Sequence, residues 1–207
     1  EKLVYGGLTK VFAGIVIAPI GGLIVGLLLT GLIITIFANR KPAPVNKTFG
    51  RLQIISSAWF ALTHGANDGQ KTMGIIALIL FSAGMIPELD IPIWVIFAAA
   101  AAMGLGTFFG GYKVIKTLGV KITRLRPYQG FAAETGGGLM LAAFAILGIP
   151  ASTTHAITGT IMGSGAARRK RAVRWKVSRQ IVFSWIITIP GAAGMGIGFT
   201  YLIHLFV

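Results

Sequence analysis

Residues 64–73, with the sequence HGANDGQKTM, carry the most unusual chemistry in this chain. They place an imidazole, a carboxylate, an ammonium and two amides inside a run that is otherwise apolar from residue 54 to residue 83. Ionisable groups at the depth that such a run implies are costly, and they usually mark a site for something polar. The segment therefore indicates a binding site rather than ordinary core.

Within this segment, Asn67 and Asp68 have the chemistry of cation ligands. Gly65 and Gly69 flank them and are expected to let the chain unwind there. Unwound carbonyls, a carboxylate and an amide are hard oxygen ligands suited to Na+ or another small cation. Asp68 could instead carry a proton. Lys71 could face an anion, or it could form a structural ion pair with Asp68.

A second polar motif, PASTTH, occupies residues 150–155. Gly-Ile-Pro at 148–150 breaks the preceding helix, and Ser152 is a good N-cap for the next one. Thr153 and Thr154 fall in the first turn of that helix. A helix N-terminus offers free backbone N–H groups and the positive end of the helix dipole, so phosphate or a carboxylate is its expected ligand. The alternative is a cap that satisfies only its own helix.

Glu134 is the other acid in an apolar region, within the sequence GFAAE. It could bind a coupling ion, or it could lie at the membrane interface paired with Arg124 or Arg126. The chain has neither a His-Glu-x-x-His pattern nor cysteine, so a zinc site is not expected. No nucleophile and base have a readable spacing, and the chain is not expected to be an enzyme.

The composition requires a membrane. The chain has 207 residues, a mean hydropathy of +0.80 and 55% hydrophobic residues. A soluble domain of this size could not hide so much apolar surface. Several apolar stretches also reach the roughly 20 residues that cross a bilayer. We therefore expect an all-α polytopic membrane protein.

The net charge of +14 does not indicate nucleic-acid binding. Sixteen of the nineteen Lys and Arg residues lie in three short stretches, residues 40–51, 113–126 and 168–179. Each stretch borders an apolar span, as the positive-inside rule predicts for cytoplasmic loops. We therefore expect a multi-pass protein of the cell membrane whose basic loops face the cytoplasm and contact lipid headgroups.

The spacing of these features predicts one transmembrane domain over residues 1–207, with about four full spans and one re-entrant helical hairpin. The second arm of the hairpin has about 16 residues, or roughly 24 Å of helix, which falls short of a bilayer core. Two tilted full spans are the alternative. Both termini are then outside, and the chain begins without Met, so we expect it to be part of a longer protein. The expected spans are residues 11–38, 53–84, 91–111 and 180–206, with the hairpin at 130–167.

Three motifs in this order resemble the inorganic phosphate transporter family known as PiT. They are THGANDGQKTMG at residues 63–74, GFAAE at 130–134 and PASTTH at 150–155, and together they cover about 130 residues. Thr63 stands where the family more often has Ser, and Gly69 stands where a small or aliphatic residue is usual. Neither departure falls on a presumed ligand.

The resemblance implies a secondary symporter that moves inorganic phosphate with Na+ or H+ and needs no cofactor. It also implies one half of an inverted-repeat transporter, here the C-terminal half, with the N-terminal half as partner and a homodimer left open. The residues that it assigns to the phosphate and cation site are Asn67, Asp68, Gln70, Ser152, Thr153 and Thr154, with Glu134 in coupling.

Three other functions stay open on the residues alone. The anion cradle does not exclude a transporter or channel for another oxyanion, such as sulfate. A non-transporting membrane scaffold or an intramembrane enzyme is a second alternative. The third is that the isolated chain is inactive because it holds only half a site.

Overall fold

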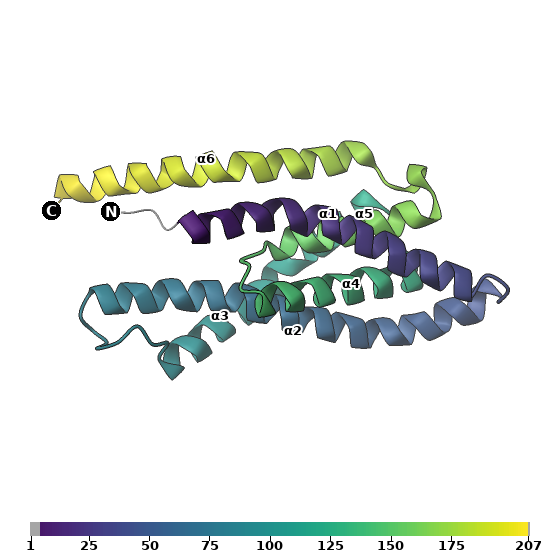
Figure 1. Ribbon diagram of the computed structural model, residues 1–207, viewed down its shortest axis with the longest axis horizontal. Coiled ribbons are helices and arrows are strands. Elements are labelled where there is room, and N and C mark those ends of the chain that lie inside the picture. Colours follow the sequence, from purple (N-terminus) through teal and green to yellow (C-terminus); the bar gives the residue numbers. More distant parts are fainter. Residues whose placement is uncertain (1–4, 207) are drawn as a thin grey trace. The chain divides into compact units, whose positions relative to one another are not determined.

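The computed structural model describes residues 5–206, and within that range every regular element is a helix (Figure 1). The chain divides into two compact units, one up to residue 173 and one from residue 174 onward. The second unit is the single helix α6 (Trp175–Phe206), which contains Pro190. The predicted all-α fold class is confirmed.

The first unit holds the two polar motifs. Its elements, in chain order, are α1 (Tyr5–Ile36), α2 (Pro42–Ser82), α3 (Ile93–Lys116), the π-helix η1 (Thr117–Ile122), α4 (Pro127–Ile146), α5 (Thr153–Arg168) and the 3-10 turn η2 (Lys170–Ala172). Helices α4 and α5 form a hairpin, and the turn between them comprises residues 147–152.

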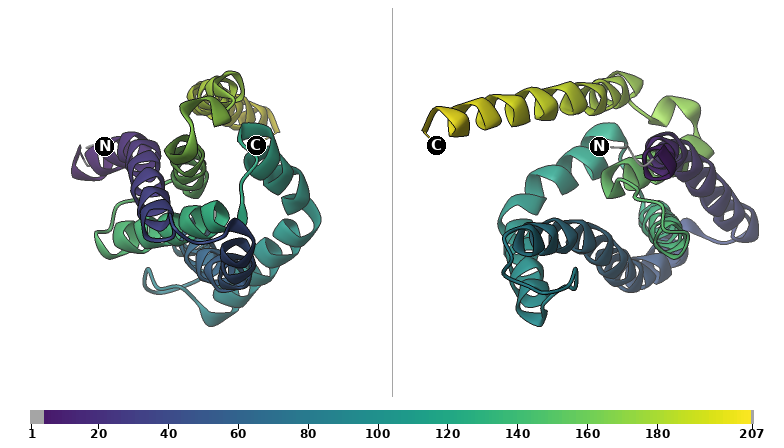
Figure 2. Two further views of the ribbon diagram at one scale, coloured as in Figure 1. Left: turned by 90° about the vertical axis from the view of Figure 1, so that its right-hand side faces the viewer. Right: turned by 60° about the vertical axis from the view of Figure 1, so that its left-hand side comes forward.

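Glycines bring the backbones of α1 and α5 into contact, and the two helices lie side by side (Figure 1, Figure 2). A Cβ atom on Gly22 would stand 2.6 Å from the carbonyl oxygen of Ala156, and one on Gly163 would collide with the carbonyl oxygen of Leu23. Small residues permit such close approach between membrane helices. The second arm of the hairpin is thereby fixed against α1.

The first arm of the hairpin packs on α2. The side chain of Gln53 fills the space beside Gly130, and the indole of Trp59 lies against Gly138. A small buried core of apolar side chains lies next to the hairpin turn and joins α1, α4 and α5. Its buried members are Ala18, Leu141, Phe144, Ala151 and Ala156.

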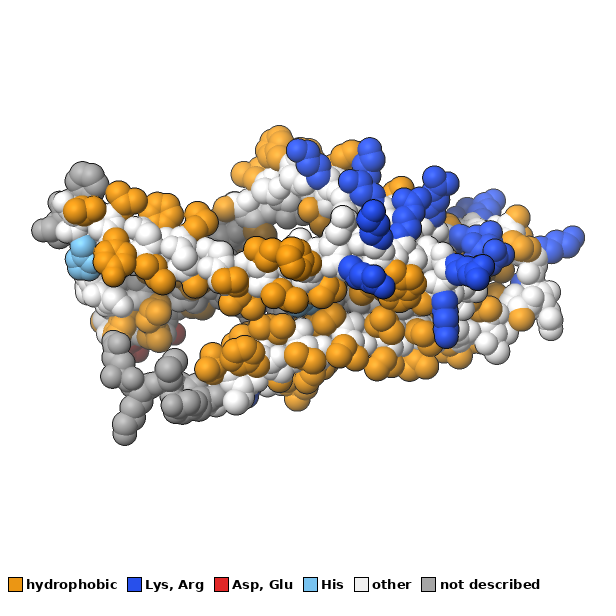
Figure 3. Space-filling view, turned by 90° about the horizontal axis from the view of Figure 1, so that it is seen from above, with side chains coloured by type: hydrophobic (Ala, Val, Ile, Leu, Met, Phe, Trp, Pro, Cys, Tyr) orange, Lys and Arg blue, Asp and Glu red, His pale blue; other side chains and the backbone are white. Residues whose placement is uncertain are grey.

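The basic stretches of the first unit converge at one end of it. Phe49 stacks edge-on against both Phe37 and Phe131, with ring centroids 5.4 and 5.3 Å apart, which joins the end of α1, the start of α2 and the start of α4. A Cβ atom on Gly165 would contact Thr123 and Val173. The C-terminal end of α5 therefore lies beside the basic stretches 113–126 and 168–179. Figure 3 shows Lys and Arg side chains gathered over one end of the face it presents.

The helices differ from the predicted spans mainly at their ends. Helix α2 starts at Pro42, so most of the basic stretch 40–51 is helical rather than loop. Proline is well tolerated in the first turn of a helix because its missing N–H would have no partner there. Within the part of the chain that the structure describes, three helices are long and apolar enough to cross a membrane: α1, α3 continued through η1, and α6. Helix α2 is not among them, so the span at 53–84 stays a prediction.

A candidate anion and cation site at the hairpin turn

The polar segment 64–73 lies within an unbroken helix. Helix α2 runs for 41 residues, and the unwinding expected at Gly65 and Gly69 does not occur. An isolated glycine in a helix costs only about 1 kcal/mol relative to alanine, which a long packed helix can absorb. The side chains therefore leave the helix at 100° intervals instead of converging on one point.

The hairpin turn presents the start of α5 to α2. Gly148 has a φ of +61°, in the left-handed region that favours glycine, and it ends the first arm. Ser152 has an extended backbone and its Oγ accepts a hydrogen bond of 3.3 Å from the backbone N–H of His155. The predicted N-cap is therefore present. The other backbone N–H groups of the first turn also point outward from the N-terminus of α5.

Asp68 is the centre of the site. Its Oδ2 accepts a hydrogen bond of 2.9 Å from the hydroxyl of Thr153, which is 4% exposed at the start of α5. The same oxygen is 3.1 Å from Nε2 of His64, one turn earlier on α2. Its Oδ1 is 3.0 Å from Nζ of Lys71. One carboxylate thus joins the two polar motifs that the sequence singles out.

Lys71 makes a second link to the hairpin. Its Nζ donates a hydrogen bond of 2.6 Å to the carbonyl oxygen of Ala151, in the turn. The ammonium therefore lies between an Asp68 oxygen and a backbone oxygen of the opposing motif. The ion pair that the sequence left as an alternative is present, and it also holds the hairpin turn against α2.

Asn67 lies on a different side of α2. Its Nδ2 donates to the carbonyl oxygens of Thr63 and Leu141, at 3.0 and 3.3 Å, and its side chain is buried between α2 and α4. One helical position rotates a side chain by about 100°, so Asn67 points toward α4 while Asp68 points toward the hairpin turn.

Gln70 and Thr154 are both exposed and make no hydrogen bond through their side chains in the described structure. Gln70 is two positions after Asp68, about 200° around the helix, and so lies on the opposite side from the hairpin turn. The structure therefore brings together Asp68, Lys71 and Thr153 with the Ser152 cap, and it does not bring Gln70 to them.

Glu134 belongs to a separate polar cluster. Its Oε2 accepts a hydrogen bond of 2.6 Å from Ser56, and its Oε1 one of 3.3 Å from Gln53. Ser56 precedes Asp68 by twelve positions, or about 18 Å along the helix. Neither Arg124 nor Arg126 is a partner of Glu134 in the described part of the chain, so the interfacial ion pair considered from the sequence is absent.

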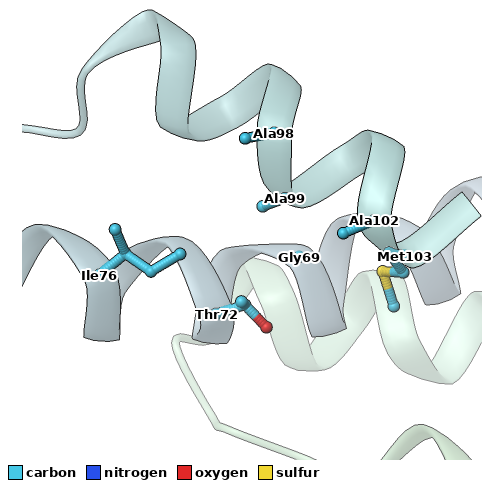
Figure 4. Close-up of a pocket in the computed structure, with 7 residues that line it drawn as sticks. All are labelled: Gly69, Thr72, Ile76, Ala98, Ala99, Ala102 and Met103. Atoms are coloured by element: carbon cyan, nitrogen blue, oxygen red, sulfur yellow. The ribbon is translucent and has the colours of Figure 1, made fainter. Parts of the chain in front are cut away.

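A shallow, largely apolar cleft lies beside the site, between α2 and α3. It has a volume of about 450 Å³. Figure 4 shows the alanine side chains of α3 facing the part of α2 that carries Gly69, Thr72 and Ile76. Its full lining is Gly69, Thr72, Ile76, Ala98, Ala99, Ala102 and Met103. The cleft offers almost no polar groups, so it is not the anion site.

Sequence reasoning missed three contributors to these clusters and assigned no specific role to a fourth, His64. The contact of His64 with Asp68 follows from their i, i+4 spacing, which places both side chains on one face of a helix. Gln53 and Ser56 are polar residues at the start of an apolar run, three positions apart, and that signal was available. The carbonyl of Ala151 could not have been found, because no side chain marks it.

These features define a helical membrane protein with a polar site at the hairpin turn. Among the described residues, three helices are long and apolar enough to cross a membrane, and large apolar side chains are exposed along them. Among the residues that the structure describes, no three His, Cys, Asp or Glu side chains gather as they would around a bound transition metal. The polar groups at the hairpin turn are a carboxylate, an ammonium, hydroxyls and a capped helix N-terminus.

The chain belongs to the phosphate transporter family, whose model matches residues 1–196. It is 50% identical over 194 residues to a probable low-affinity inorganic phosphate transporter of Rhizobium meliloti (strain 1021). It is 40% identical over 193 residues to a protein of the same description from Bacillus subtilis (strain 168). Each match covers 93% of this chain but 58% of the relative, so the chain spans little more than half the length of these relatives.

The fold is also similar to a solved structure, described as the sodium-dependent phosphate transporter. The TM-score is 0.63 at 26% sequence identity, and the match covers 88% of this chain and 56% of that one. The resemblance noted from the sequence motifs is thereby confirmed, and the chain is a multi-pass membrane protein.

Proposed function

We propose that this chain forms half of the substrate site of a secondary transporter, which moves inorganic phosphate together with Na+ or H+. The observation that carries the proposal is the contact between Asp68 on α2 and Thr153 at the start of α5. It places an acidic group suited to a cation next to a helix N-terminus suited to an anion. The names of the relatives and of the solved neighbour support phosphate as the anion.

On the phosphate side, the first turn of α5 supplies the main cradle. Its backbone N–H groups, the positive end of the helix dipole and the hydroxyls of Ser152 and Thr154 favour an oxyanion. Thr153 joins them when its hydroxyl turns from Asp68 to the substrate. Lys71 adds a positive charge next to this turn. Gln70 faces away from the turn. Its proposed contact with phosphate therefore requires further protein groups, which approach α2 from its other side and complete the site there.

On the cation side, Asp68 is the proposed principal ligand. Asn67 is one position away but is bonded to α4, so it acts as a ligand only if its amide turns from Leu141. Glu134, on α4, takes part in coupling from a separate position, because its partner Ser56 lies about 18 Å along α2 from Asp68. The description of the solved neighbour as sodium-dependent favours Na+ over H+ as the coupling ion.

The proximity of the two ligands provides the coupling. Two like charges 4 Å apart repel by about 4 kcal/mol at an effective dielectric constant near 20. An anion held beside Asp68 meets this repulsion unless a cation lies between them. A cation that removes the repulsion raises the affinity for phosphate, and phosphate raises the affinity for the cation by the same factor. Rocking of the hairpin against the other helices would then expose the site to each side in turn.

The proposal extends to the surroundings of the chain. The basic end of the first unit faces the cytoplasm, and its Lys and Arg side chains contact lipid headgroups of the cell membrane. The second half of the site comes from an N-terminal half of the same transporter, related to this chain as an inverted repeat. A homodimer of the complete transporter is a further assembly that the proposal allows.

Uptake of labelled phosphate into liposomes that contain the complete transporter tests the proposal. Asp68→Asn should abolish the dependence of uptake on the cation, whereas Asp90→Asn, in the exposed loop before α3, should leave it unchanged. An Asp68→Asn variant with full cation-dependent uptake would refute the assignment. Excess unlabelled sulfate distinguishes the alternative substrate, because it should compete only if the site accepts other oxyanions.

A further inference from the structure

We infer that the ammonium of Lys71 is a built-in cation, which occupies the Asp68 site when Na+ is absent and must leave it when Na+ binds. The inference rests on the proposed function and specifies the order in which the two ligands bind. It assigns Lys71 two alternating partners, the carboxylate of Asp68 and the transported phosphate.

The geometry shows the ammonium already in a cation position. Nζ of Lys71 is 3.0 Å from Oδ1 of Asp68 and 2.6 Å from the carbonyl oxygen of Ala151. A carboxylate oxygen and a backbone carbonyl are the hard oxygen ligands that Na+ uses at broken membrane helices. The ammonium therefore occupies the position between α2 and the hairpin turn where an entering Na+ would coordinate the same two oxygen atoms.

Asp68 stays in place when the ammonium leaves, because other groups hold it. Its Oδ2 accepts the hydrogen bond from Thr153 and contacts His64, and neither interaction involves Oδ1. The side chain of Lys71 is 41% exposed and has a flexible four-carbon stem. The exchange thus requires rotation of one exposed side chain and no rearrangement of the helices.

The two cations exclude one another because of their like charges. A Na+ bound to Oδ1 of Asp68 would lie within a few ångströms of Nζ in its present position, and a single carboxylate cannot neutralise both charges. The backbone of Lys71 stays on α2 beside the hairpin turn, so the displaced ammonium remains within reach of the first turn of α5. Binding of Na+ therefore releases a positive charge toward the phosphate cradle, so Na+ should bind before phosphate.

The reactivity of the Lys71 amine reports its displacement directly. The complete transporter, purified in detergent, is acetylated with an amine-reactive ester in increasing NaCl, and choline chloride keeps the ionic strength constant. Mass spectrometry then gives the acetylation rate of Lys71 relative to Lys47, an exposed lysine on the same helix. We expect saturating Na+ to raise the relative rate of Lys71 by about threefold or more.

The Asp68→Asn variant is the control for this experiment. Without the carboxylate, Lys71 should already react at the high rate, and Na+ should not change it. A rate for Lys71 in the unmodified protein that does not respond to Na+ would overturn the inference. Phosphate binding to the same sample, with and without Na+, then shows whether the proposed function fails as well or only this refinement of it.

A second variant tests the competition from the side of the ion. Lys71→Met removes the built-in cation, so the apparent affinity for Na+, measured with Na+ alone, should rise about tenfold. Phosphate affinity at saturating Na+ should fall, because the released charge is missing. The matched variant Lys47→Met should change neither value. An unchanged or weaker affinity for Na+ in Lys71→Met would contradict the inference.

Discussion

The hydroxyl of Thr153 donates a hydrogen bond of 2.9 Å to Oδ2 of Asp68, although the two residues are 85 positions apart in the chain. The bond joins the middle of α2 to the first turn of α5. Thr153 is buried and the carboxylate accepts from other donors as well, so the bond is charge-assisted and lies partly out of water. Each partner therefore depends on the other for its position.

Thr153→Val removes this bond while keeping the shape of the side chain. Hydrogen bonds to a charged group contribute about 1.5–3 kcal/mol, so we expect thermal unfolding in detergent at a clearly lower temperature, together with weaker phosphate binding. Thr107→Val, at an exposed position on α3, should alter neither. Equal unfolding temperatures for the two variants would show that the bond does not stabilise the hairpin.

Gly163 determines how closely α5 approaches α1. A Cβ atom there would collide with the carbonyl oxygen of Leu23, which is backbone and cannot move aside. We expect Gly163→Ala to destabilise the protein by about 1–3 kcal/mol, the usual cost of overpacking. Gly31→Ala is the matched control, because its Cβ would meet nothing within 4 Å. When thermal unfolding of both variants is measured in the same detergent, the unfolding temperature of Gly31→Ala should equal or exceed that of the parent protein.

The Glu134 and Asp68 clusters should behave independently in stability. They are about 18 Å apart along α2, and substitutions at such distances usually add within about 0.5 kcal/mol. The unfolding free energies of Asp68→Asn, Glu134→Gln and the double variant should therefore be additive. Ser56→Ala combined with Glu134→Gln should not be additive, since Ser56 donates directly to Glu134. A coupling above about 1 kcal/mol between Asp68 and Glu134 would argue for one joined site.

The proposed membrane orientation can be read from single cysteines, because the chain contains none. Arg171→Cys lies in the basic η2 turn and Glu88→Cys in the acidic loop between α2 and α3, and both positions are exposed. A membrane-impermeant maleimide added to intact cells should label residue 88, and it should label residue 171 only after permeabilisation. Labelling of residue 171 in intact cells would contradict the proposed orientation and indicate the opposite one.

The helix break at Gly148 and the helix start at Ser152 could be read from the sequence because their signals are local. Gly148 adopts the left-handed conformation that its type allows, and Ser152 caps the next helix as its side chain permits. Both depend on neighbouring residues only, so a reading of 148–155 suffices. The same holds for the membrane class, since long apolar helices follow from composition.

The reading of Gly65 and Gly69 was wrong for an equally physical reason. Glycine allows a helix to unwind but does not require it, and α2, which packs against α4, is continuous across both glycines. Once the helix is continuous, its geometry separates neighbours that the sequence treated as one set. Asn67 faces α4, Asp68 faces the hairpin turn and Gln70 faces the other way.

The sequence by itself determined which side chains have the chemistry for a polar site inside an apolar protein, and it determined that α5 begins at Ser152–Thr153. Only the tertiary structure decided which of them meet. The pairing of Asp68 with Thr153, the place of Lys71 between Asp68 and the Ala151 carbonyl, and the separate position of Glu134 all depend on how α4 and α5 pack on α1 and α2. Contacts between residues about 80 positions apart are set by the glycine-lined helix interfaces, and no local pattern in the chain records them.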